Sequence, residues 1–461
     1  LLLGGDTDAV PFRYAYAMTC EYGLAREDSL PCDLYFSDLD GTWDENNNNI
    51  FGEVEDNVDL HPDIFVGRAP VENVSEAQTF VANIAAYEDC IQEDHLQRVL
   101  FLAAILWSDP YTNSGESKDY IDEEFLPDFL DITKLYQALG NENLATTMVA
   151  MNAGQNFINH DGHAWYSSIG VGDDYMGYSD VDAVDSDGRF AASMYSIGCW
   201  SAAFDFDVMG EHFITNPDGC TVGYIGNSSY GWGSPGNPLY GYSDALDHLY
   251  HDYLYSDWSL TNAELLALTK EYFIPYSHWE NVYRWHRYDV SLLGDPPLRA
   301  YRVSPSSITV DCPDIVNVNT SLIPVQVSGV NPAGLTVCVH DEGSNWGVTV
   351  LDASGAFTFV MESPVTGDVK VTVTGPGIRR TTVDIPQATG PDPVISQLII
   401  DDDMEYGQLS PGCSSDLQIT LLNQGTENLT NVEWEMYLGD LLDSAGKNSS
   451  LFGAIDAGNE S

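Results

Sequence analysis

The sequence is poor in positive charge. Its 461 residues include 71 Asp and Glu but only 16 Lys and Arg, five of them Lys, so the formal net charge is −55. Such a surface repels phosphate backbones and anionic lipid headgroups, and no cluster of Lys and Arg interrupts it. The sequence therefore argues against nucleic-acid binding and peripheral membrane binding. Its excess of carboxylates suits a saline or calcium-rich medium.

Long apolar runs are also missing. No stretch approaches the roughly 18 to 20 apolar residues that a helix needs to cross a bilayer, so no membrane insertion is predicted. The chain has no initiator Met and no signal peptide, and it opens on residues 1–6 (LLLGGD), which predict a buried strand and a turn. From this start we expect that upstream sequence has been removed or is missing.

Metal-binding cysteine motifs are absent as well. The eight cysteines form no CxxC motif and no Cys/His cluster, which argues against structural zinc and leaves disulfide pairing open. Six N-x-S/T sequons permit glycosylation, although several are expected by chance in a chain rich in Asn and Ser. Together with the acidity and the β-rich tail, they predict a secreted or cell-surface protein. The sequons lie at Asn73, Asn227, Asn319, Asn428, Asn448 and Asn459.

What the sequence does contain is enough apolar surface to fold. Hydrophobic residues make up 44% and aromatic residues 11%, including 10 Trp and 26 Tyr, so this is not a disordered acidic polymer. The length predicts two or three domains.

Residues 1–302 alternate short apolar strands with amphipathic helices. This order predicts an α/β domain with a largely parallel sheet flanked by helices. The expected helices cover 75–90, which begins with a capping-box spacing, and 116–138, 240–256 and 262–274. The expected strands lie at 1–3, 64–67, 99–106, 147–151, 155–159, 191–197 and 222–225.

After residue 302 the pattern changes to short alternating strands between Gly, Pro and Asn turns. Residues 303–388 predict an immunoglobulin-like (Ig-like) β-sandwich, with strands near 307–310, 324–327, 335–339, 357–360 and 369–373. A linker precedes residues 394–461, which predict a further β-domain with strands near 395–400, 417–423 and 432–438. At roughly 70 residues this last domain is short for a sandwich of about 100, so we expect it to be incomplete.

Two reactive side chains follow neighbouring apolar segments. His163 comes soon after the strand that ends near residue 159, and Cys199 follows the strand that ends near residue 197. The carboxyl ends of parallel strands share one crevice, so the two side chains are predicted to meet there. A thiolate is a nucleophile, and a nearby imidazole can lower the thiol pKa and later protonate the leaving amine. The alternative is that Cys199 is a buried apolar residue and His163 an ordinary loop histidine.

Several segments in the same order resemble the gingipain type of caspase-like cysteine peptidase. The resemblance extends over nearly 300 residues, and an Ig-like module after the catalytic domain is typical of that family. The matching segments are 1–6 with Val10-Pro11, 64–68 (IFVGR), 115–117 (GES), 159–163 (NHDGH), 198–199 (GC), 232–235 (WGSP) and 293–296 (LGDP).

This resemblance implies roles for individual residues. It implies that Cys199 is the nucleophile, that His163 is the general acid and base, and that Trp232 is a wall of the pocket for the P1 side chain, the residue before the scissile bond. An isolated Trp is otherwise more often a core residue. Backbone N–H groups at Cys199 and in the turn at Gly162 are expected to bind the oxyanion, with Gly162 and Gly198 leaving room for the substrate.

The sequence departs from this family at three positions. Ala164 follows the histidine where Gly is usual, and Gly198 precedes the cysteine where Ala is common. Lys118 stands where arginine-specific members carry an Asp that pairs with the substrate, and Asp119 comes next. If Lys118 points into the pocket beside Trp232, it will disfavour basic P1 residues, whereas an inward Asp119 will favour them.

An Asn-rich segment predicts a structural calcium site. Asp44, Asn46 and Asn48, the carbonyl of Ile50 and the carboxylate of Glu55 match positions 1, 3, 5, 7 and 12 of an EF-type loop. Asn49 stands where Gly is usual, and Asn tolerates the left-handed conformation. The alternative is a solvated polar turn.

We therefore expect a secreted, calcium-stabilised cysteine endopeptidase that acts on protein or peptide substrates. Its β-domains are expected to serve spacing, attachment or cell-surface and filament assembly. Two rivals remain: a surface or filament protein that keeps the peptidase fold as a scaffold, and a module that binds peptides without cleaving them.

Overall fold

The computed structural model describes residues 1–21, 24–402, 415–435 and 449–456. The chain divides into two compact units, Leu1–Pro305 and Ser306–Ser461. This division falls within three residues of the boundary that the sequence predicts.

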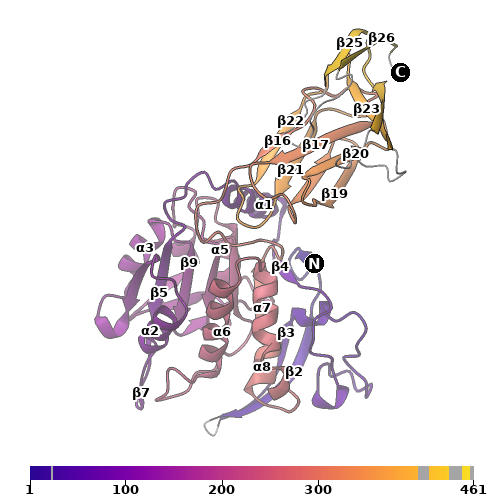
Figure 1. The fold of residues 1–461 in the computed structure, drawn as a ribbon. Helices are drawn as coiled ribbons and strands as arrows, with labels where there is room; N and C mark the ends of the chain where they lie inside the picture. Colours follow the sequence, from indigo (N-terminus) through magenta and orange to yellow (C-terminus); the bar gives the residue numbers. More distant parts are fainter. Residues whose placement is uncertain (22–23, 403–414, 436–448, 457–461) are drawn as a thin grey trace. The chain divides into compact units, whose positions relative to one another are not determined.

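The first unit is built on an eight-stranded sheet with the order β1-β4-β15-β14-β13-β9-β5-β8 (Figure 1). Neighbouring strands are parallel except β14 and β15, which are antiparallel. The sheet is therefore largely parallel, as expected. Its strands are β1 (Leu2–Gly4), β4 (Gly67–Ala69), β5 (Arg98–Ala103), β8 (Asp131–Tyr136), β9 (Phe157–Asp161), β13 (Ser193–Ser196), β14 (Gly223–Asn227) and β15 (Val290–Gly294).

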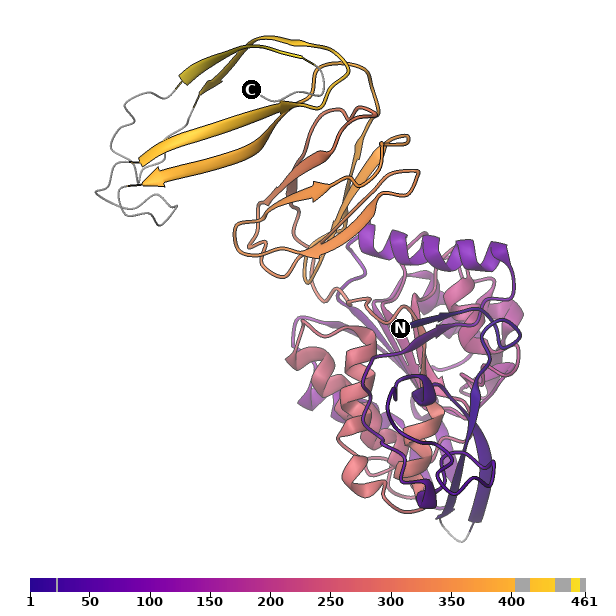
Figure 2. The same ribbon diagram turned by 90° about the vertical axis from the view of Figure 1, so that its right-hand side faces the viewer.

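Helices cover both faces of this sheet because its central strands are apolar on both sides. In β5, Phe101 packs into the core beneath α2, α6 and α7, whereas Leu100 and Leu102 pack into the core beneath α1, α3, α4 and α5. Figures 1 and 2 show this layering. The helices are α1 (Val74–Asp89), α2 (Gly115–Glu124), α3 (Leu144–Asn152), α4 (Tyr178–Val181), α5 (Met209–Thr215), α6 (Tyr242–Ser256) and α7 (Asn262–Glu271).

Two predicted elements of this domain were wrong. Residues 147–151, expected as a strand, lie in α3, because the Asn143 side chain accepts a hydrogen bond from the Thr146 N–H and caps a helix there. The helix expected over 116–138 ends at Glu124. After a turn at Pro127 the chain forms β8, the edge strand beside β5. The β-branched residues at 147–151 suggested a strand, and the many polar residues at 116–138 suggested one long helix.

The sequence also missed a subdomain beside the sheet. It contains the hairpin of β2 (Arg13–Glu21) and β3 (Leu24–Cys32), which packs on α8 (Val282–Asp289). The shared core includes Trp43, Trp232 and Trp285. Two small antiparallel sheets complete the unit. One pairs β6 (Ile105–Ser108) with β7 (Tyr111–Asn113), and the other contains β10 (Ala164–Trp165), β11 (Ser168–Val171) and β12 (Asp174–Gly177).

In the second unit, two antiparallel sheets share one apolar core. Along β17, Ile323, Val325 and Val327 are buried while the residues between them are exposed, which is the period of two that the sequence shows. One sheet contains β16 (Thr309–Asp311), β17 (Leu322–Ser328) and β20 (Ala356–Val360). The other contains β19 (Trp346–Val350), β18 (Thr336–His340), β21 (Val369–Thr374) and β22 (Thr381–Ile385).

The rest of the second unit contains two strand pairs. A small core of Leu421, Leu429 and Ile455 lies between them. The expected strand at 432–438 is described only to Glu435. The pairs are β23 (Pro393–Asp402) with β24 (Ser415–Asn423), and β25 (Leu429–Glu435) with β26 (Ser449–Ile455).

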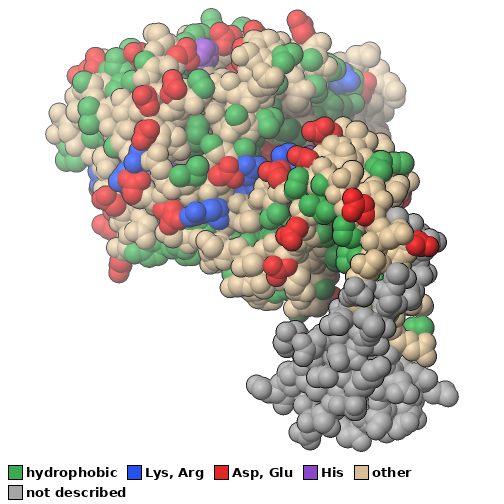
Figure 3. Space-filling view, turned by 90° about the horizontal axis from the view of Figure 1, so that it is seen from above, with side chains coloured by type: hydrophobic (Ala, Val, Ile, Leu, Met, Phe, Trp, Pro, Cys, Tyr) green, Lys and Arg blue, Asp and Glu red, His purple; other side chains and the backbone are tan. Residues whose placement is uncertain are grey.

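The surface reflects the composition. On the face shown in Figure 3, acidic side chains are scattered widely and Lys and Arg appear in small numbers among them. Within the described part of the chain, none of the helices has the length and apolarity to span a bilayer.

The structure bears on the glycosylation sequons and on the cysteines. The Asn227 amide is buried and donates to the carbonyls of Ile197 and Gly198, so this sequon is not available to a glycan. Asn448 and Asn459 lie outside the described residues. Among the described residues, Cys32, Cys199, Cys220, Cys312 and Cys338 are free thiols.

Candidate active site

The histidine turn follows β9, whose five residues are all buried. His160, within the strand, contacts the Ser196 hydroxyl and the Gly170 carbonyl through its two ring nitrogens, at 2.8 and 2.9 Å. Burial lowers the pKa of His160 to about 4, so it is a neutral core residue. His163, three residues later, is exposed. Of the two histidines, therefore, only His163 is accessible to a substrate.

The His163 ring is held by a main-chain group. Its Nε2 lies 3.2 Å from the carbonyl oxygen of Leu106 in β6. A carbonyl only accepts hydrogen bonds, so this contact assigns the proton of the neutral ring to Nε2 and leaves a lone pair on Nδ1. The sequence gave no sign of this contact because it depends on a carbonyl 57 residues away.

The cysteine turn follows β13, the neighbour of β9 in the sheet. The Cys199 Sγ lies 3.8 Å from the Gly231 carbonyl. Burial, the largest effect, raises the pKa of the Cys199 thiol to about 11, while the Gly231 contact lowers it. The thiol is therefore protonated at neutral pH in the substrate-free protein and needs a base before it can attack.

The two turns pack directly against each other. A Cβ built on Gly198 would lie 2.5 Å from the Ala164 Cβ and 3.0 Å from the Gly162 carbonyl oxygen. The next residues along also meet, since the rings of Trp165 and Trp200 lie 4.3 Å apart. Gly198, which precedes Cys199, thus lies against both neighbours of His163, and this contact brings the two turns together at the carboxyl edge of the sheet.

Both glycines of the predicted oxyanion site are needed for this packing. A side chain on Gly162 would meet the His160 ring at 2.6 Å, and one on Gly198 would separate the two turns. Because the two turns pack closely, the backbone N–H group of Gly162 lies on one turn and that of Cys199 on the turn that faces it.

An aromatic residue that the sequence analysis did not single out lies beside the cysteine turn. The ring of Tyr230 is 4.1 Å from that of Trp200, the residue after Cys199. Trp232, which was expected to line the pocket, is only 9% exposed and packs on Trp285 at 5.9 Å. Trp232 is therefore mainly a core residue, which was the simpler reading of an isolated tryptophan.

Lys118 does not point into an open pocket. Its side chain is fully buried, and the ammonium lies 2.5 Å from Asp247 and 3.6 Å from Asp161. Asp119 also has internal partners, because Lys134 lies 2.6 Å away and the Tyr136 hydroxyl donates to it. The expectation that Lys118 points into the substrate pocket is wrong, because a buried charge requires a partner and Lys118 has two inside the protein. The Asp119 side chain is 48% exposed, so its role toward a basic substrate stays a prediction.

A second acid, Asp244, completes the buried group around Lys118. Burial is the main cause that raises the pKa of both Asp161 and Asp244, and it raises that of Asp244 well above its ordinary value. The Lys118 ammonium opposes this rise in both acids.

The Asn-rich loop is formed, but with a different acid from the one expected. The side-chain oxygens of Asp44, Asn46 and Asn48 accept hydrogen bonds from backbone N–H groups of the loop. Glu53 contacts the amides of Asn46 and Asn48 at 3.2 and 2.5 Å, whereas Glu55 is exposed. The backbone of the loop brings the Glu53 carboxylate to Asn46 and Asn48, although the spacing of EF-type loops assigns the acidic position to Glu55.

Asn49 adopts the left-handed conformation, with a φ of 65°, as the calcium-loop reading requires. Another acidic group, Asp38, Asp40 and Asp63, is the only described set of three potential ligands with closely spaced atoms. Its oxygens accept hydrogen bonds from Gly41, Trp43 and Leu39. Asp38 and Asp63 thus have hydrogen-bond partners within the protein.

Comparisons with known proteins identify the family of the first domain. The model of the family "Peptidase family C25" matches residues 1–301. The search of curated proteins gave no significant match.

Three solved structures share the fold. A structure described as a protease is 18% identical over 84% of this chain and 82% of its own, with a TM-score of 0.63. The Arg-specific cysteine proteinase gingipain R (RgpB) is 14% identical over 84% and 83%, with a TM-score of 0.60. The complex of Porphyromonas gingivalis RgpB pro- and mature domains is 15% identical over 84% and 85%, also with a TM-score of 0.60.

Proposed function

Because the chain belongs to peptidase family C25 and is a cysteine-type peptidase, we propose that Cys199 and His163 form its catalytic pair. The observation that carries this proposal is the packing of the two turns. Gly198 lies against Gly162 and Ala164, which flank the histidine. The reaction is hydrolysis of peptide bonds in protein substrates.

The contacts of the histidine suggest how the proton moves. The Leu106 carbonyl holds the proton on Nε2, so the Nδ1 lone pair is the base that takes the Cys199 proton. The sulfur then attacks the substrate carbonyl carbon, and the imidazolium returns the proton to the leaving amine. Water then attacks the thioester carbonyl while His163 Nδ1 takes one of its protons, the C–S bond breaks to release the carboxylic acid product, and the proton passes to the sulfur to regenerate the thiol.

The oxyanion of each tetrahedral intermediate needs donors that are already in place. The backbone N–H groups of Cys199 and Gly162 lie on the two facing turns and are the proposed donors. They need no reorganisation during the reaction, which is the physical basis of such stabilisation.

The test compares casein hydrolysis by the wild type with Cys199→Ala, His163→Ala and the control Cys312→Ser. Cys312 is a partly buried thiol of the second unit, so its loss is expected to leave the rate unchanged. Each active-site variant is expected to lose at least about 1,000-fold in kcat, because nucleophile and base act as a unit.

Alkylation provides an independent measurement on the wild type. Iodoacetamide followed by peptide mapping is expected to modify Cys199 in proportion to the loss of activity. Full activity after complete Cys199 modification, or undiminished hydrolysis by Cys199→Ala, would overturn the assignment. Absence of turnover with an inert Cys199 would favour the scaffold alternative.

We also propose that the Asn-rich loop binds a structural calcium ion. Asp44, Asn46, Asn48 and the Ile50 carbonyl supply oxygen ligands, and Glu53 takes the place that spacing gave to Glu55. The oxygens are those that calcium prefers, and the left-handed Asn49 supports the sharp turn. Calcium here would stabilise the subdomain beside the sheet and take no part in the chemistry.

Secretion and an Ig-like second domain complete the proposal. Acidity and the sequons other than Asn227 support an extracellular setting. The two antiparallel sheets around one core support an Ig-like sandwich at 303–388. Such domains suit spacing or attachment at a cell surface or in a filament.

A further inference from the structure

An apolar cavity lies at the opposite edge of the sheet from the catalytic turns. It is lined by His95, which precedes β5, and Phe190, which precedes β13, so it faces the amino ends of strands whose carboxyl ends lead to the active site. Its volume is about 150 Å³. An apolar cavity of about 150 Å³ is large enough to bind benzene. Tyr87 and Leu96 provide further apolar wall.

The His95 ring presents a lone pair that no described residue satisfies. Nε2 lies 3.1 Å from the Phe190 carbonyl, so it carries the proton, and Nδ1 is an acceptor. His95 is 4% exposed, and its Nδ1 has no hydrogen-bond partner among the described residues. Burial lowers the pKa of His95 to about 4, so the ring is neutral and the lone pair is available.

Gln92 presents a second acceptor on the same cavity. Its amide nitrogen donates to the Asp187 carbonyl at 2.7 Å, which fixes the orientation of the amide. The Oε1 atom is buried and, within the described ranges, has no partner either. An unpaired buried acceptor costs about 1–3 kcal/mol, so two of them on one cavity call for a donor.

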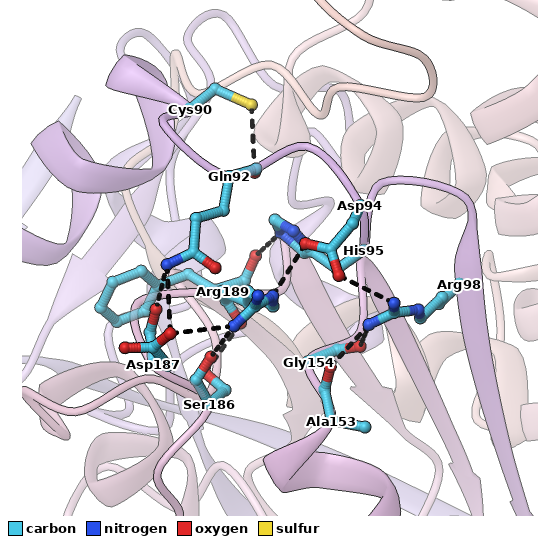
Figure 4. Close-up of polar contacts among 11 residues, drawn as sticks. Cys90, Gln92, Asp94, His95, Arg98, Ala153, Gly154, Ser186, Asp187 and Arg189 are labelled. Carbon is cyan, nitrogen blue, oxygen red and sulfur yellow. Dashed lines mark hydrogen bonds and ion pairs between the residues drawn. The ribbon is translucent and has the colours of Figure 1, made fainter.

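The loop that carries these acceptors is held rigidly. Asp94 pairs with Arg98 at 2.9 Å and with Arg189 at 2.8 Å, and Arg189 also contacts Asp187. Figure 4 shows this network running past His95 and Gln92. The acceptors are thus positioned before any ligand arrives, which reduces the entropic cost of binding.

We propose that this cavity is a binding site for a small aromatic molecule that carries one O–H or N–H donor. The apolar walls contact the ring, and the donor bonds to His95 Nδ1 or Gln92 Oε1. A charged ligand is disfavoured because the walls offer it no counter-ion. The proposal does not depend on the catalytic assignment, since the two sites lie at opposite edges of the sheet.

The test titrates the full-length protein with phenol and with fluorobenzene, which has a similar size but no donor. We expect phenol to bind with a Kd of about 1 mM and about tenfold more tightly than fluorobenzene. In protein labelled with ¹⁵N-histidine, phenol is expected to shift the His95 Nδ1 resonance, and fluorobenzene is not. These measurements need no variant.

Two variants sharpen the result. His95→Phe keeps the ring but removes the acceptor, so phenol and fluorobenzene should then bind within about twofold of each other. Ala86→Trp, at the exposed rim on the last turn of α1, should block both ligands while the protein still hydrolyses casein. Equal binding of the two ligands to the wild type would overturn the proposal. So would absence of saturable binding, or phenol binding that survives Ala86→Trp.

Discussion

The ammonium of Lys118 lies 2.5 Å from the Asp247 carboxylate, and neither side chain is accessible to solvent. Coulombic attraction to Asp247 and Asp161 keeps the pKa of Lys118 raised even though burial alone, the largest effect, lowers it. The charge at this position is therefore neutralised inside the protein. This removes the reason to expect that Lys118 repels basic P1 side chains.

Breaking this pair should destabilise the fold. Lys118→Met leaves Asp247 as a buried charge with a weaker set of partners, and we expect a loss of about 3–5 kcal/mol in the free energy of unfolding. Lys134→Met, which removes the half-exposed partner of Asp119, should cost less than about 1 kcal/mol. Urea titration followed by fluorescence measures both. A Lys118→Met protein as stable as Lys134→Met would contradict the buried-pair interpretation.

The contact between the two catalytic turns predicts a compensating pair of substitutions. Gly198→Ala places a Cβ 2.5 Å from that of Ala164, so it should separate the turns and reduce kcat about 10- to 100-fold. Ala164→Gly in the same protein removes that clash and should restore most of the rate. The swap produces the Gly-after-His and Ala-before-Cys pattern that the resemblance implies.

Gly4→Ala is the matched control for this swap, because a Cβ at Gly4 meets no atom within 4 Å. Its kcat should equal that of the wild type. If Gly198→Ala alone is fully active, or if Ala164→Gly brings no recovery, the packing of these turns does not limit catalysis.

From the raised pKa of Glu211 we predict that the folded protein becomes less stable as the pH rises. Burial is the main cause that raises its pKa from about 4.5 to about 9. The folded state therefore keeps a proton between these pH values that the unfolded state releases, so the free energy of unfolding falls as pH rises from about 4.5 to 9.

Glu211→Gln removes this cost and should be about 1–3 kcal/mol more stable than the wild type at pH 8, with a smaller difference at pH 5. Glu123→Gln, at an exposed position, should show neither effect. Denaturant titrations at the two pH values provide the measurement. A difference that does not change with pH would show that Glu211 is ionised in the folded protein.

Chelation tests the calcium proposal. An ion bound only by the folded state stabilises it by mass action, so excess EGTA should lower Tm in the wild type. In Asp44→Ala the EGTA effect should shrink by at least half, whereas Asp40→Ala, in the neighbouring acidic group, should retain it. A Tm that EGTA does not change would identify the Asn-rich loop as a polar turn. Loss of the effect in Asp40→Ala alone would move the ion to that group.

Local pattern was sufficient for much of this protein. Alternating apolar residues predicted β17 and β21, and the strand–loop order placed His163 and Cys199 after adjacent parallel strands. Local signals failed where long-range pairing outweighed propensity. Residues 131–136 became a strand because β5 offered an unpaired edge, which no feature of the segment itself indicates.

What the sequence by itself determined was the α/β class of the first domain and the peptidase family, because these depend on periodicity and on the order of segments along the chain. Only the tertiary structure decided which way side chains point. It buried Lys118 against Asp247, put Trp232 into a core, brought Glu53 to the Asn-rich loop and set the Leu106 carbonyl against His163. Each of these outcomes depends on groups distant in sequence or on local backbone curvature, which spacing does not encode.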